Sequence, residues 1–225
     1  MDRQPCLWRS TCTAVFGRVA GFVAPAAARR LARALAVPVL AALMLQCGAG
    51  PVEATAPETA GLAIGRPAPA FALTDQTGTV VSLESLLKTG PVALVFSRSV
   101  DWCLYCKLQL VHLQRDLGEI EASGSRVVCI THDSVEKIHA FATRSGITFP
   151  VLSDPESKAI DAYDIRCTDA PPEFRGIARH ATFIIGQDGV IRSKLFELSY
   201  QERSAVNALI HALEEARTMN GRSRT

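Results

Sequence analysis

Two cysteines three residues apart are the side chains of this sequence best suited to chemistry. Cys103 and Cys106 follow the apolar run at residues 92–96 and open a segment with helical spacing. A thiol at the N-terminal end of a helix is stabilised as the thiolate by the helix dipole, which makes its sulfur a nucleophile near neutral pH. A second thiol three residues later lies on the same helix face and can close a disulfide with the first. The pair therefore predicts dithiol–disulfide redox chemistry, with Cys103 as the attacking sulfur because it is nearest the helix start.

Two other interpretations of the pair are less favoured. Half of a zinc site would need two further ligands, and the rest of the predicted domain has no second Cys-x-x-Cys. A purely structural disulfide across so short a loop would remove little entropy from the unfolded chain. Cys129 lies in an apolar, strand-like run and is expected to pack in the core. Cys167 lies in an irregular stretch, where a role as a third thiol in disulfide exchange stays open.

Charge is unevenly distributed along the 225 residues of the chain. Residues 1–52 hold six arginines and one acidic residue while the whole chain has a net charge of +2, so the remainder has a net charge of −3. A mildly acidic body lacks the basic surface that nucleic-acid binding requires. We therefore expect no nucleic-acid partner.

The basic N-terminal segment has the layout of an export signal. Three arginines between residues 29 and 33 precede a twelve-residue apolar run at residues 34–45. Such a run matches the apolar centre of a signal and is short for spanning a bilayer. We expect export, to the periplasm in a bacterium, and membrane attachment through the N-terminus stays open. Two further alternatives are a twin-arginine signal at Arg29–Arg30 and a lipid on Cys47.

The remaining sequence predicts one α/β domain. Expected strands lie near residues 71–73, 79–81, 92–97, 127–130, 149–152, 182–185 and 190–196, and expected helices at 82–87, 103–122, 134–144, 155–163 and 201–217. This order predicts a three-layer fold with a mixed central sheet, helices on both faces and an N-terminal β-hairpin. The expected organisation is an export signal or membrane anchor at 1–47, a flexible linker at 48–62, the domain at 63–217 and a disordered tail at 218–225.

The motifs together resemble a known family. The Trp-Cys-x-x-Cys-Lys at residues 102–107 is similar to thioredoxin-fold active sites. The wider frame resembles the redoxin branch that holds the peroxiredoxins, the alkyl hydroperoxide reductase/thiol-specific antioxidant family. That frame spans roughly residues 63–215, and its motifs are Gly-x-Pro-Ala-Pro-x-Phe-x-Leu at 65–73, Phe-Pro-Val-Leu-Ser-Asp at 149–154, Arg-His-Ala-Thr-Phe-Ile-Ile at 179–185 and Asp-Gly-Val-Ile at 188–191.

The resemblance carries expectations about the site. It implies a thioredoxin-like fold and an antioxidant oxidoreductase that reduces hydroperoxides with electrons from a thiol reductant, without a cofactor or metal. Cys103 would be oxidised first and Cys106 would resolve the intermediate. Arg179 matches the position of an arginine that lies near the reactive sulfur, where a guanidinium lowers the thiol pKa and holds a peroxide oxygen.

The sequence also departs from the family pattern. Peroxiredoxins carry Pro-x-x-x-Thr-x-x-Cys, whereas Phe96 and Val100 stand in the proline and threonine places before Cys103. His180 stands where related folds have a cis-proline, and its peptide bond is expected to be trans. Two alternatives therefore stay open: an exported thiol–disulfide oxidoreductase that acts on protein disulfides, and a redox-inactive binding module that keeps the fold.

Overall fold

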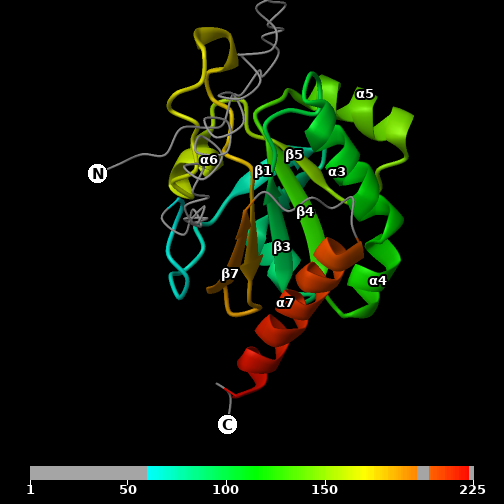
Figure 1. Ribbon diagram of the computed structural model, residues 1–225, viewed down its shortest axis with the longest axis vertical. Helices are drawn as coiled ribbons and strands as arrows, with labels where there is room; N and C mark the ends of the chain where they lie inside the picture. The colour runs from blue at the N-terminus through cyan, green and yellow to red at the C-terminus, as the bar shows by residue number, and fades with distance from the viewer. Residues whose placement is uncertain (1–59, 197–202, 223–225) are drawn as a thin grey trace, which may run out of the picture. The chain divides into compact units, whose positions relative to one another are not determined.

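A mixed sheet of seven strands forms the centre of the part of the chain that the computed structural model describes, residues 60–196 and 203–222 (Figure 1). The strands are β1 (Ala72–Asp75), β2 (Val80–Ser82), β3 (Val92–Phe96), β4 (Arg126–Thr131), β5 (Val151–Ser153), β6 (Ala181–Ile185) and β7 (Ile191–Phe196). The helices are α2 (Leu83–Leu87), α3 (Leu104–Arg115), α4 (Leu117–Ala122), α5 (Val135–Ser145), α6 (Lys158–Ala162) and α7 (Arg203–Arg222), with a 3-10 turn at Pro172–Phe174. This order is the predicted one.

The sheet has the strand order β2-β1-β5-β4-β3-β6-β7. β3, β4 and β5 are parallel, while β1 pairs antiparallel with both β2 and β5, and β6 pairs antiparallel with β3 and β7. The predicted N-terminal β-hairpin is β1–β2, and the strands predicted at 182–185 and 190–196 form a second hairpin, β6–β7. Because β3 and β4 are parallel, their carboxyl ends meet at one edge of the sheet.

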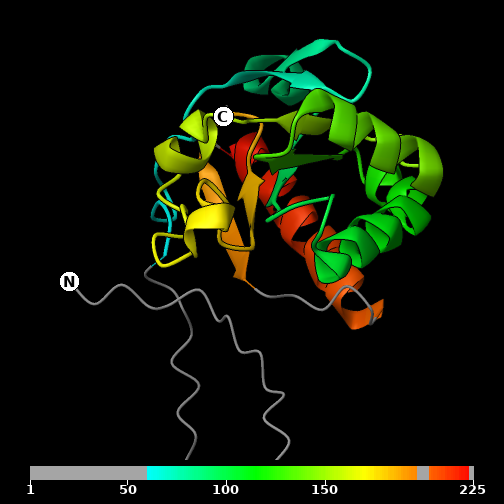
Figure 2. The same cartoon turned by 90° about the horizontal axis from the view of Figure 1, so that it is seen from above.

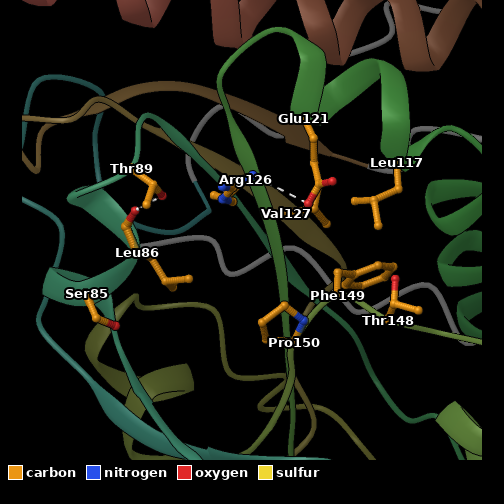
Figure 3. Close-up of a pocket in the computed structure, with 10 residues that line it drawn as sticks. All are labelled: Ser85, Leu86, Thr89, Leu117, Glu121, Arg126, Val127, Thr148, Phe149 and Pro150. Carbon is orange, nitrogen blue, oxygen red and sulfur yellow. Dashed lines mark hydrogen bonds and ion pairs between the residues drawn. The ribbon is translucent and has the colours of Figure 1, made fainter.

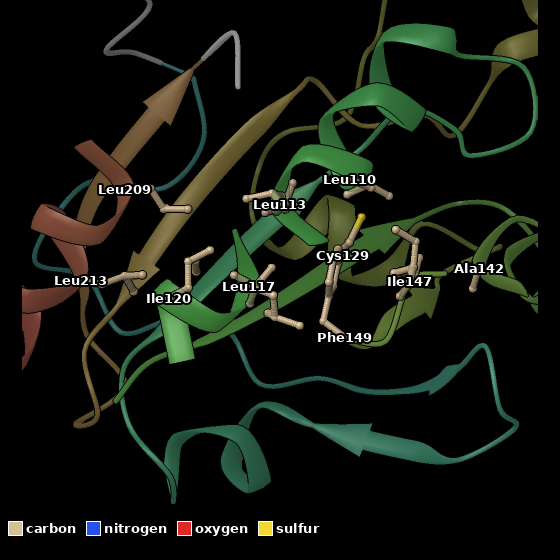
Figure 4. Close-up of a cluster of buried hydrophobic side chains, with 14 of the residues drawn as sticks. Leu110, Leu113, Leu117, Ile120, Cys129, Ala142, Ile147, Phe149, Leu209 and Leu213 are labelled. Carbon is tan, nitrogen blue, oxygen red and sulfur yellow. The ribbon is translucent and has the colours of Figure 1, made fainter. Parts of the chain in front are cut away.

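Successive side chains of a strand point to opposite faces of the sheet, so the buried strands contribute to two core clusters, one on each face. Ala93 and Val95 of β3 face a cluster that α3, α4, α5 and α7 cover. Figure 4 shows labelled leucines that reach this cluster from α3, α4 and α7. Val92, Leu94 and Phe96 face the other cluster, to which α2, α6 and the chain before β1 contribute. Figure 2 shows helical layers on both sides of the strands. The predicted three-layer arrangement is confirmed.

Local sequence signals account for the element boundaries. Ser82 forms a capping box with Ser85 at the start of α2. Gly146 ends α5 in the left-handed conformation at φ 65°, which glycine adopts without the steric cost of a side chain. β3 is buried at all five positions, as the continuous apolar run predicts for a central parallel strand.

Three boundaries differ from the predicted ones. The helix expected at 103–122 breaks at Asp116, whose backbone (φ −100°, ψ 8°) leaves the helical region, and α4 then redirects Leu117 and Ile120 into the core. α7 continues to Arg222 rather than ending at residue 217, because no glycine or proline interrupts it before Gly221. Leu62 packs on the domain, with its N–H donating to the Tyr163 carbonyl at 3.2 Å, so ordered structure begins before residue 63.

The expected signal at residues 1–47 and most of the expected linker lie outside the described residues. None of the helices within the described ranges is both long enough and apolar enough to cross a membrane.

Candidate active site

Cys103 and Cys106 form a disulfide at the start of α3, one loop after β3. Their Cα atoms lie 5.3 Å apart. Cys103 is the N-cap residue of α3, with an extended backbone (φ −84°, ψ 99°), and its Sγ accepts a hydrogen bond from the Cys106 N–H at 3.2 Å. The sulfur of Cys103 therefore lies at the positive end of the helix dipole, as the spacing predicts.

The two sulfurs differ in exposure. Cys103 is 6% exposed, whereas Cys106 is fully buried on the α3 face that also carries Leu110 and Leu113. A reagent arriving from solvent therefore meets Cys103 first. In the reduced protein, Cys106 is placed to attack whatever forms on Cys103.

Aromatic packing fixes the strand end from which the dithiol loop departs. Phe96, the last residue of β3, lies with its ring centroid 5.0 Å from Tyr163 and 5.8 Å from Phe183. The backbone N–H of Ser97 then donates to the Ile130 carbonyl at 2.9 Å. The loop at residues 97–102 thus starts from a rigid point of the sheet.

A buried carboxylate holds the middle of this loop. Asp133, just after β4 and 4% exposed, accepts hydrogen bonds from the Ser99 hydroxyl (2.8 Å) and the Val100 N–H (2.6 Å). The Thr131 hydroxyl is a third donor to this carboxylate, at 2.8 Å. The Ser99 Oγ accepts in turn from the N–H groups of Asp101 (3.0 Å) and Trp102 (3.4 Å). Asp133 and Ser99 thus connect β4 to the residues directly before Cys103.

His180 lies against α3 beside the dithiol. Its ring centroid is 5.6 Å from that of Tyr105, and its Nε2 is hydrogen-bonded to Gln109 Oε1. Its Nδ1 is buried without a hydrogen-bond partner among the described residues. Burial, together with the charge of Arg98, lowers the pKa of His180 to about 4. His180 is therefore neutral at physiological pH, and no cis peptide bond occurs among the described residues, in line with the trans bond expected here.

Two arginines approach the same edge of the sheet from neighbouring strands. Arg98 follows β3 and Arg179 precedes β6, and these strands pair through Phe96 and Ala181. Nε of Arg98 is buried without a hydrogen-bond partner in the described parts of the chain. The described contacts of Arg179 are made by its backbone, whose N–H donates to the Ile165 carbonyl at 2.6 Å. The strand pairing brings Arg179 to the correct edge, and its predicted contact with the sulfur stays a prediction.

The rim of the site combines aromatic and charged side chains. The Trp102 ring lies 4.6 Å from the Phe174 ring of the 3-10 turn. Asp101 forms an exposed ion pair with Lys137 at 2.8 Å, and this hydrogen bond lowers the pKa of the Asp101 carboxyl. The Lys107 ammonium donates to the Asp101 carbonyl at 2.7 Å. The rim thus ties the loop to both α3 and α5.

The other two cysteines of the domain come from different elements than the dithiol turn. Cys129 is fully buried within β4 in the core cluster of Figure 4, and burial together with the nearby charge of Asp133 raises the pKa of its thiol. The predicted packing role of Cys129 is confirmed. Cys167 is 4% exposed, in the segment between α6 and β6, with Sγ 3.4 Å from Asp169 Oδ1.

The Asp133–Ser99 contact and the side chain of Gln109 are features of the site that sequence reasoning missed. A signal for Gln109 exists, because it is a polar residue on the buried face shared by Cys106, Leu110 and Leu113. A polar side chain at such a position needs a hydrogen-bond partner from another element, which here is His180. No comparable signal marks the pairing of Ser99 with Asp133, 34 residues apart in the chain.

A hollow of about 330 Å³ lies at the opposite end of β4 (Figure 3). It is lined by Ser85, Leu86, Thr89, Leu117, Glu121, Arg126, Val127, Thr148, Phe149 and Pro150. Arg126 pairs across the sheet with Val92, the first residue of β3, whereas the dithiol loop follows the last. The hollow is thus separated from the loop by the length of the strand, about 13 Å at 3.3 Å per residue. It is not part of the dithiol site.

Comparisons with known proteins agree with this geometry. The model of the AhpC/TSA family matches residues 64–194. Alkyl hydroperoxide reductase E of Mycobacterium tuberculosis is 33% identical over 133 residues, which cover 58% of this chain and 83% of that protein. The crystal structure of peroxidoxin BcpB from Mycobacterium tuberculosis has a TM-score of 0.61 at 24% identity, covering 68% of this chain and 97% of that one. This likeness shows the shared thioredoxin-like fold.

A second kind of relative matches a shorter stretch. The thiol–disulfide oxidoreductase ResA of Bacillus subtilis is 30% identical over 102 residues, covering 45% of this chain. The chain spans 55% of that protein.

Proposed function

The chain belongs to the AhpC/TSA family, and from that premise we propose that it is a thiol-dependent peroxidase that reduces hydroperoxides through Cys103 and Cys106. One observation carries the proposal: the two sulfurs are within bonding reach at the start of α3, with Cys103 at the helix N-terminus and Cys106 buried behind it. The likeness to an alkyl hydroperoxide reductase supports the choice of substrate class.

The proposed cycle has three steps: oxidation of Cys103, formation of the disulfide and reduction by an external thiol. The Cys103 thiolate attacks one oxygen of the hydroperoxide, the O–O bond breaks, and the alkoxide leaves as an alcohol after taking a proton. Cys103 is then a sulfenic acid. The Cys106 thiolate attacks its sulfur, the disulfide forms, and the hydroxyl leaves as water. An external thiol reductant restores both thiols by disulfide exchange and supplies the two electrons that the peroxide consumed.

The surrounding residues have distinct parts in this proposal. The N-terminus of α3 favours the Cys103 thiolate by its positive end. We propose that the guanidinium of Arg98, whose charge acts on His180, favours the thiolate as well. Arg179 holds the peroxide oxygen that becomes the leaving group. His180 stays neutral in this cycle, because burial and the charge of Arg98 lower its pKa to about 4, and its contacts with Tyr105 and Gln109 pack its ring against α3. No step requires a cofactor or a metal.

A thiol–disulfide oxidoreductase acting on protein disulfides is the second candidate. It is favoured by the Trp102-Cys103-x-x-Cys106 turn itself and by the likeness to ResA. The chemistry would start from the same Cys103 thiolate, with a protein disulfide sulfur in place of the peroxide oxygen. The two candidates differ in the electron acceptor, not in the sulfur that reacts.

Stoichiometry tests the proposed peroxidase. The fully reduced chain is mixed with less than one equivalent of an alkyl hydroperoxide, and alcohol formation and the Cys103–Cys106 disulfide are followed together by mass spectrometry. We expect one disulfide and one alcohol per hydroperoxide consumed. If the hydroperoxide persists and the dithiol stays reduced, the peroxidase proposal is wrong, and the disulfide oxidoreductase becomes the favoured candidate.

We also propose that the protein works after export, in the periplasm of a bacterial cell, with the N-terminus serving as a signal or as a membrane anchor. The arginines before the apolar run at residues 34–45 support this location. Fusion of residues 1–60 to a phosphatase that is active only outside the cytoplasm tests it. An inactive, cytoplasmic fusion would contradict export. The mass of the native chain, recovered from membrane and soluble fractions, separates a cleaved signal from a retained anchor.

A further inference from the structure

The loop at residues 97–102 leads directly to Cys103, and it is anchored to the rest of the domain by core packing of Val100, by the Trp102–Phe174 ring contact and by a set of polar contacts. Its first residue is held by β4, and its last residue leads into α3. Between these ends, Arg98 contacts His132 through its carbonyl (2.9 Å to Nδ1), and the exposed side chain of Asp101 pairs with Lys137. The buried polar contacts of the middle residues converge on a single side chain, Asp133.

The hydrogen bonds of Asp133 have a clear direction. Both carboxylate oxygens accept: Oδ1 from the Ser99 hydroxyl, and Oδ2 from the Val100 N–H and the Thr131 hydroxyl. Because Ser99 gives its proton to Asp133, its lone pairs are free to accept from the N–H groups of Asp101 and Trp102. The carboxylate therefore orders three consecutive N–H groups before Cys103, one directly and two through the serine.

The position of Asp133 is itself fixed from the sheet. The Ser153 hydroxyl, at the end of β5, donates to the Asp133 carbonyl at 2.7 Å, and both residues are buried. The carboxylate is thus a rigid extension of the β4–β5 edge, and the loop is held against it. Hydrogen bonds to a charged acceptor are stronger than those between neutral groups, particularly when water is excluded.

We propose that Asp133 and Ser99 are positioning residues of the dithiol: the Asp133 carboxylate, acting through the Ser99 hydroxyl, holds Cys103 in the N-cap conformation in which its sulfur reacts. Neither side chain contacts the reacting sulfur. This inference rests on the proposed role of Cys103 as the attacking thiolate, but it holds for a peroxide or a disulfide as the oxidant.

Ser99 and Ser153 provide a matched pair of variants. Both are buried serines whose hydroxyl donates to Asp133. The Ser99 hydroxyl, in the loop, donates to the Asp133 carboxylate at 2.8 Å, whereas the Ser153 hydroxyl, in the sheet, donates to the Asp133 main-chain carbonyl at 2.7 Å. Ser153→Ala removes the donation of one hydroxyl to the Asp133 carbonyl, whereas Ser99→Ala removes the donation to the Asp133 carboxylate and also the acceptance from the N–H groups of Asp101 and Trp102. Denaturant unfolding of both variants measures the difference in stability that this leaves. A merely structural role for Ser99 would give both variants the same reactivity at Cys103.

The test uses the reduced full chain and a small alkylating reagent, so that it does not depend on any oxidant. Trypsin releases residues 99–107 as one peptide, because Arg98 precedes it and Lys107 ends it, and fragmentation of that peptide separates alkylation at Cys103 from alkylation at Cys106. The rate at Cys103 is measured from pH 5 to pH 9 for each variant.

The expected results differ between the paired variants. Ser99→Ala lowers the alkylation rate of Cys103 at pH 7 by about tenfold, the equivalent of one charge-assisted hydrogen bond, and moves the midpoint of the pH profile upward. Ser99→Thr, which keeps the hydroxyl, restores the rate, and Ser153→Ala leaves the rate and midpoint within about twofold of the parent. Asp133→Asn behaves like Ser99→Ala, and the double variant is no slower than Asp133→Asn alone, because both changes break one linkage.

Equal pH profiles for Ser99→Ala and Ser153→Ala would overturn the inference, as would a double variant whose loss is the product of the two single losses. Denaturant unfolding of each variant shows that the molecules compared are folded. If wild-type Cys103 reacts rapidly but reduces no hydroperoxide, the proposed peroxidase fails while the positioning inference is still tested by the same profiles.

Discussion

At the scale of single residues, the two cysteines of the dithiol have unequal access to solvent. Cys103 is 6% exposed and accepts the Cys106 N–H, whereas Cys106 is fully buried. Because Cys103 is the more exposed of the two residues and lies at the helix N-terminus, we expect an oxidant to meet it first. We therefore predict attack by Cys103 and resolution by Cys106.

Substitution of each cysteine in turn tests this order. In Cys106→Ser, hydroperoxide converts Cys103 to a sulfenic acid that persists and can be trapped by a sulfenic-acid reagent. In Cys103→Ser, the remaining buried thiol is oxidised at least about a hundredfold more slowly, because it has lost the helix N-terminus and lies away from solvent. Mass spectrometry of the 99–107 peptide reads both outcomes. A sulfenic acid that forms on Cys106 in Cys103→Ser at the parent rate would reverse the assignment.

Arg98 and Arg179 are predicted to act at different steps. Loss of the positive charge in Arg98→Gln raises the pKa of the Cys103 thiol, so the rates of both alkylation and peroxide reduction fall at pH 7 by about tenfold. Arg179→Gln slows peroxide reduction by a similar factor but leaves alkylation nearly unchanged, because an alkylating reagent has no oxygen to be held. Parallel measurement of both rates separates the roles. A loss of alkylation alone in Arg179→Gln would contradict this division.

His180 makes stability depend on pH in a defined window. Its folded pKa of about 4 lies below the ordinary value of 6.5, since burial and Arg98 disfavour the charged ring. Stability from this residue is present above pH 6.5 and is lost as the pH falls from 6.5 to 4, by about 1–3 kcal/mol. Urea unfolding of the parent and of His180→Gln at pH 7, 5.5 and 4 measures this. An equally steep decline in the variant would assign the effect to other groups.

At the scale of elements, the turns that bring β3 and β4 side by side leave no space for a side chain at Gly90. A Cβ at this position would lie 2.0 Å from the Gly124 carbonyl oxygen, and the backbone φ of 153° also disfavours other residues. Gly90→Ala is therefore expected to lower the free energy of unfolding by about 2–4 kcal/mol. Guanidinium unfolding monitored by circular dichroism measures the loss.

Gly118 is the matched control for this substitution. It lies within α4 with open space around a built Cβ. Gly118→Ala should raise the free energy of unfolding by about 0.5–1 kcal/mol, because alanine loses less backbone entropy in a helix. We therefore predict that the two glycine-to-alanine changes shift the free energy of unfolding in opposite directions. Equal effects at both positions would show that the close approach at Gly90 does not control stability.

The elements were predictable from sequence where one signal dominated. The strand at 92–97, the neighbouring strands at 182–185 and 190–196 and the helix at 134–144 each depend on nearby residues, and each is confirmed. The break at Asp116 was not predicted, because the apolar spacing continues through it from α3 into α4. Local periodicity reports which face is buried, not where a buried helix changes direction.

At the scale of the whole molecule, the sequence predicted the edge of the sheet at which chemistry occurs but not the contacts that prepare it. The parallel order of β3 and β4 places the dithiol loop beside Asp133, as expected for carboxyl ends of parallel strands. The Ser99–Asp133 and Gln109–His180 contacts join residues 34 and 71 positions apart, and no local pattern encodes such pairs.

We propose that a peroxide, not a protein disulfide, is the preferred oxidant of Cys103. The direct measurement is the second-order rate constant for oxidation of the reduced full chain by an alkyl hydroperoxide and, in parallel, by a protein disulfide at the same pH, with Cys103→Ser as the blank. We expect the hydroperoxide to react at least about tenfold faster, and we expect Cys103→Ser to abolish the difference. A faster reaction with the protein disulfide, with peroxide at the rate of a free thiol, would contradict this proposal.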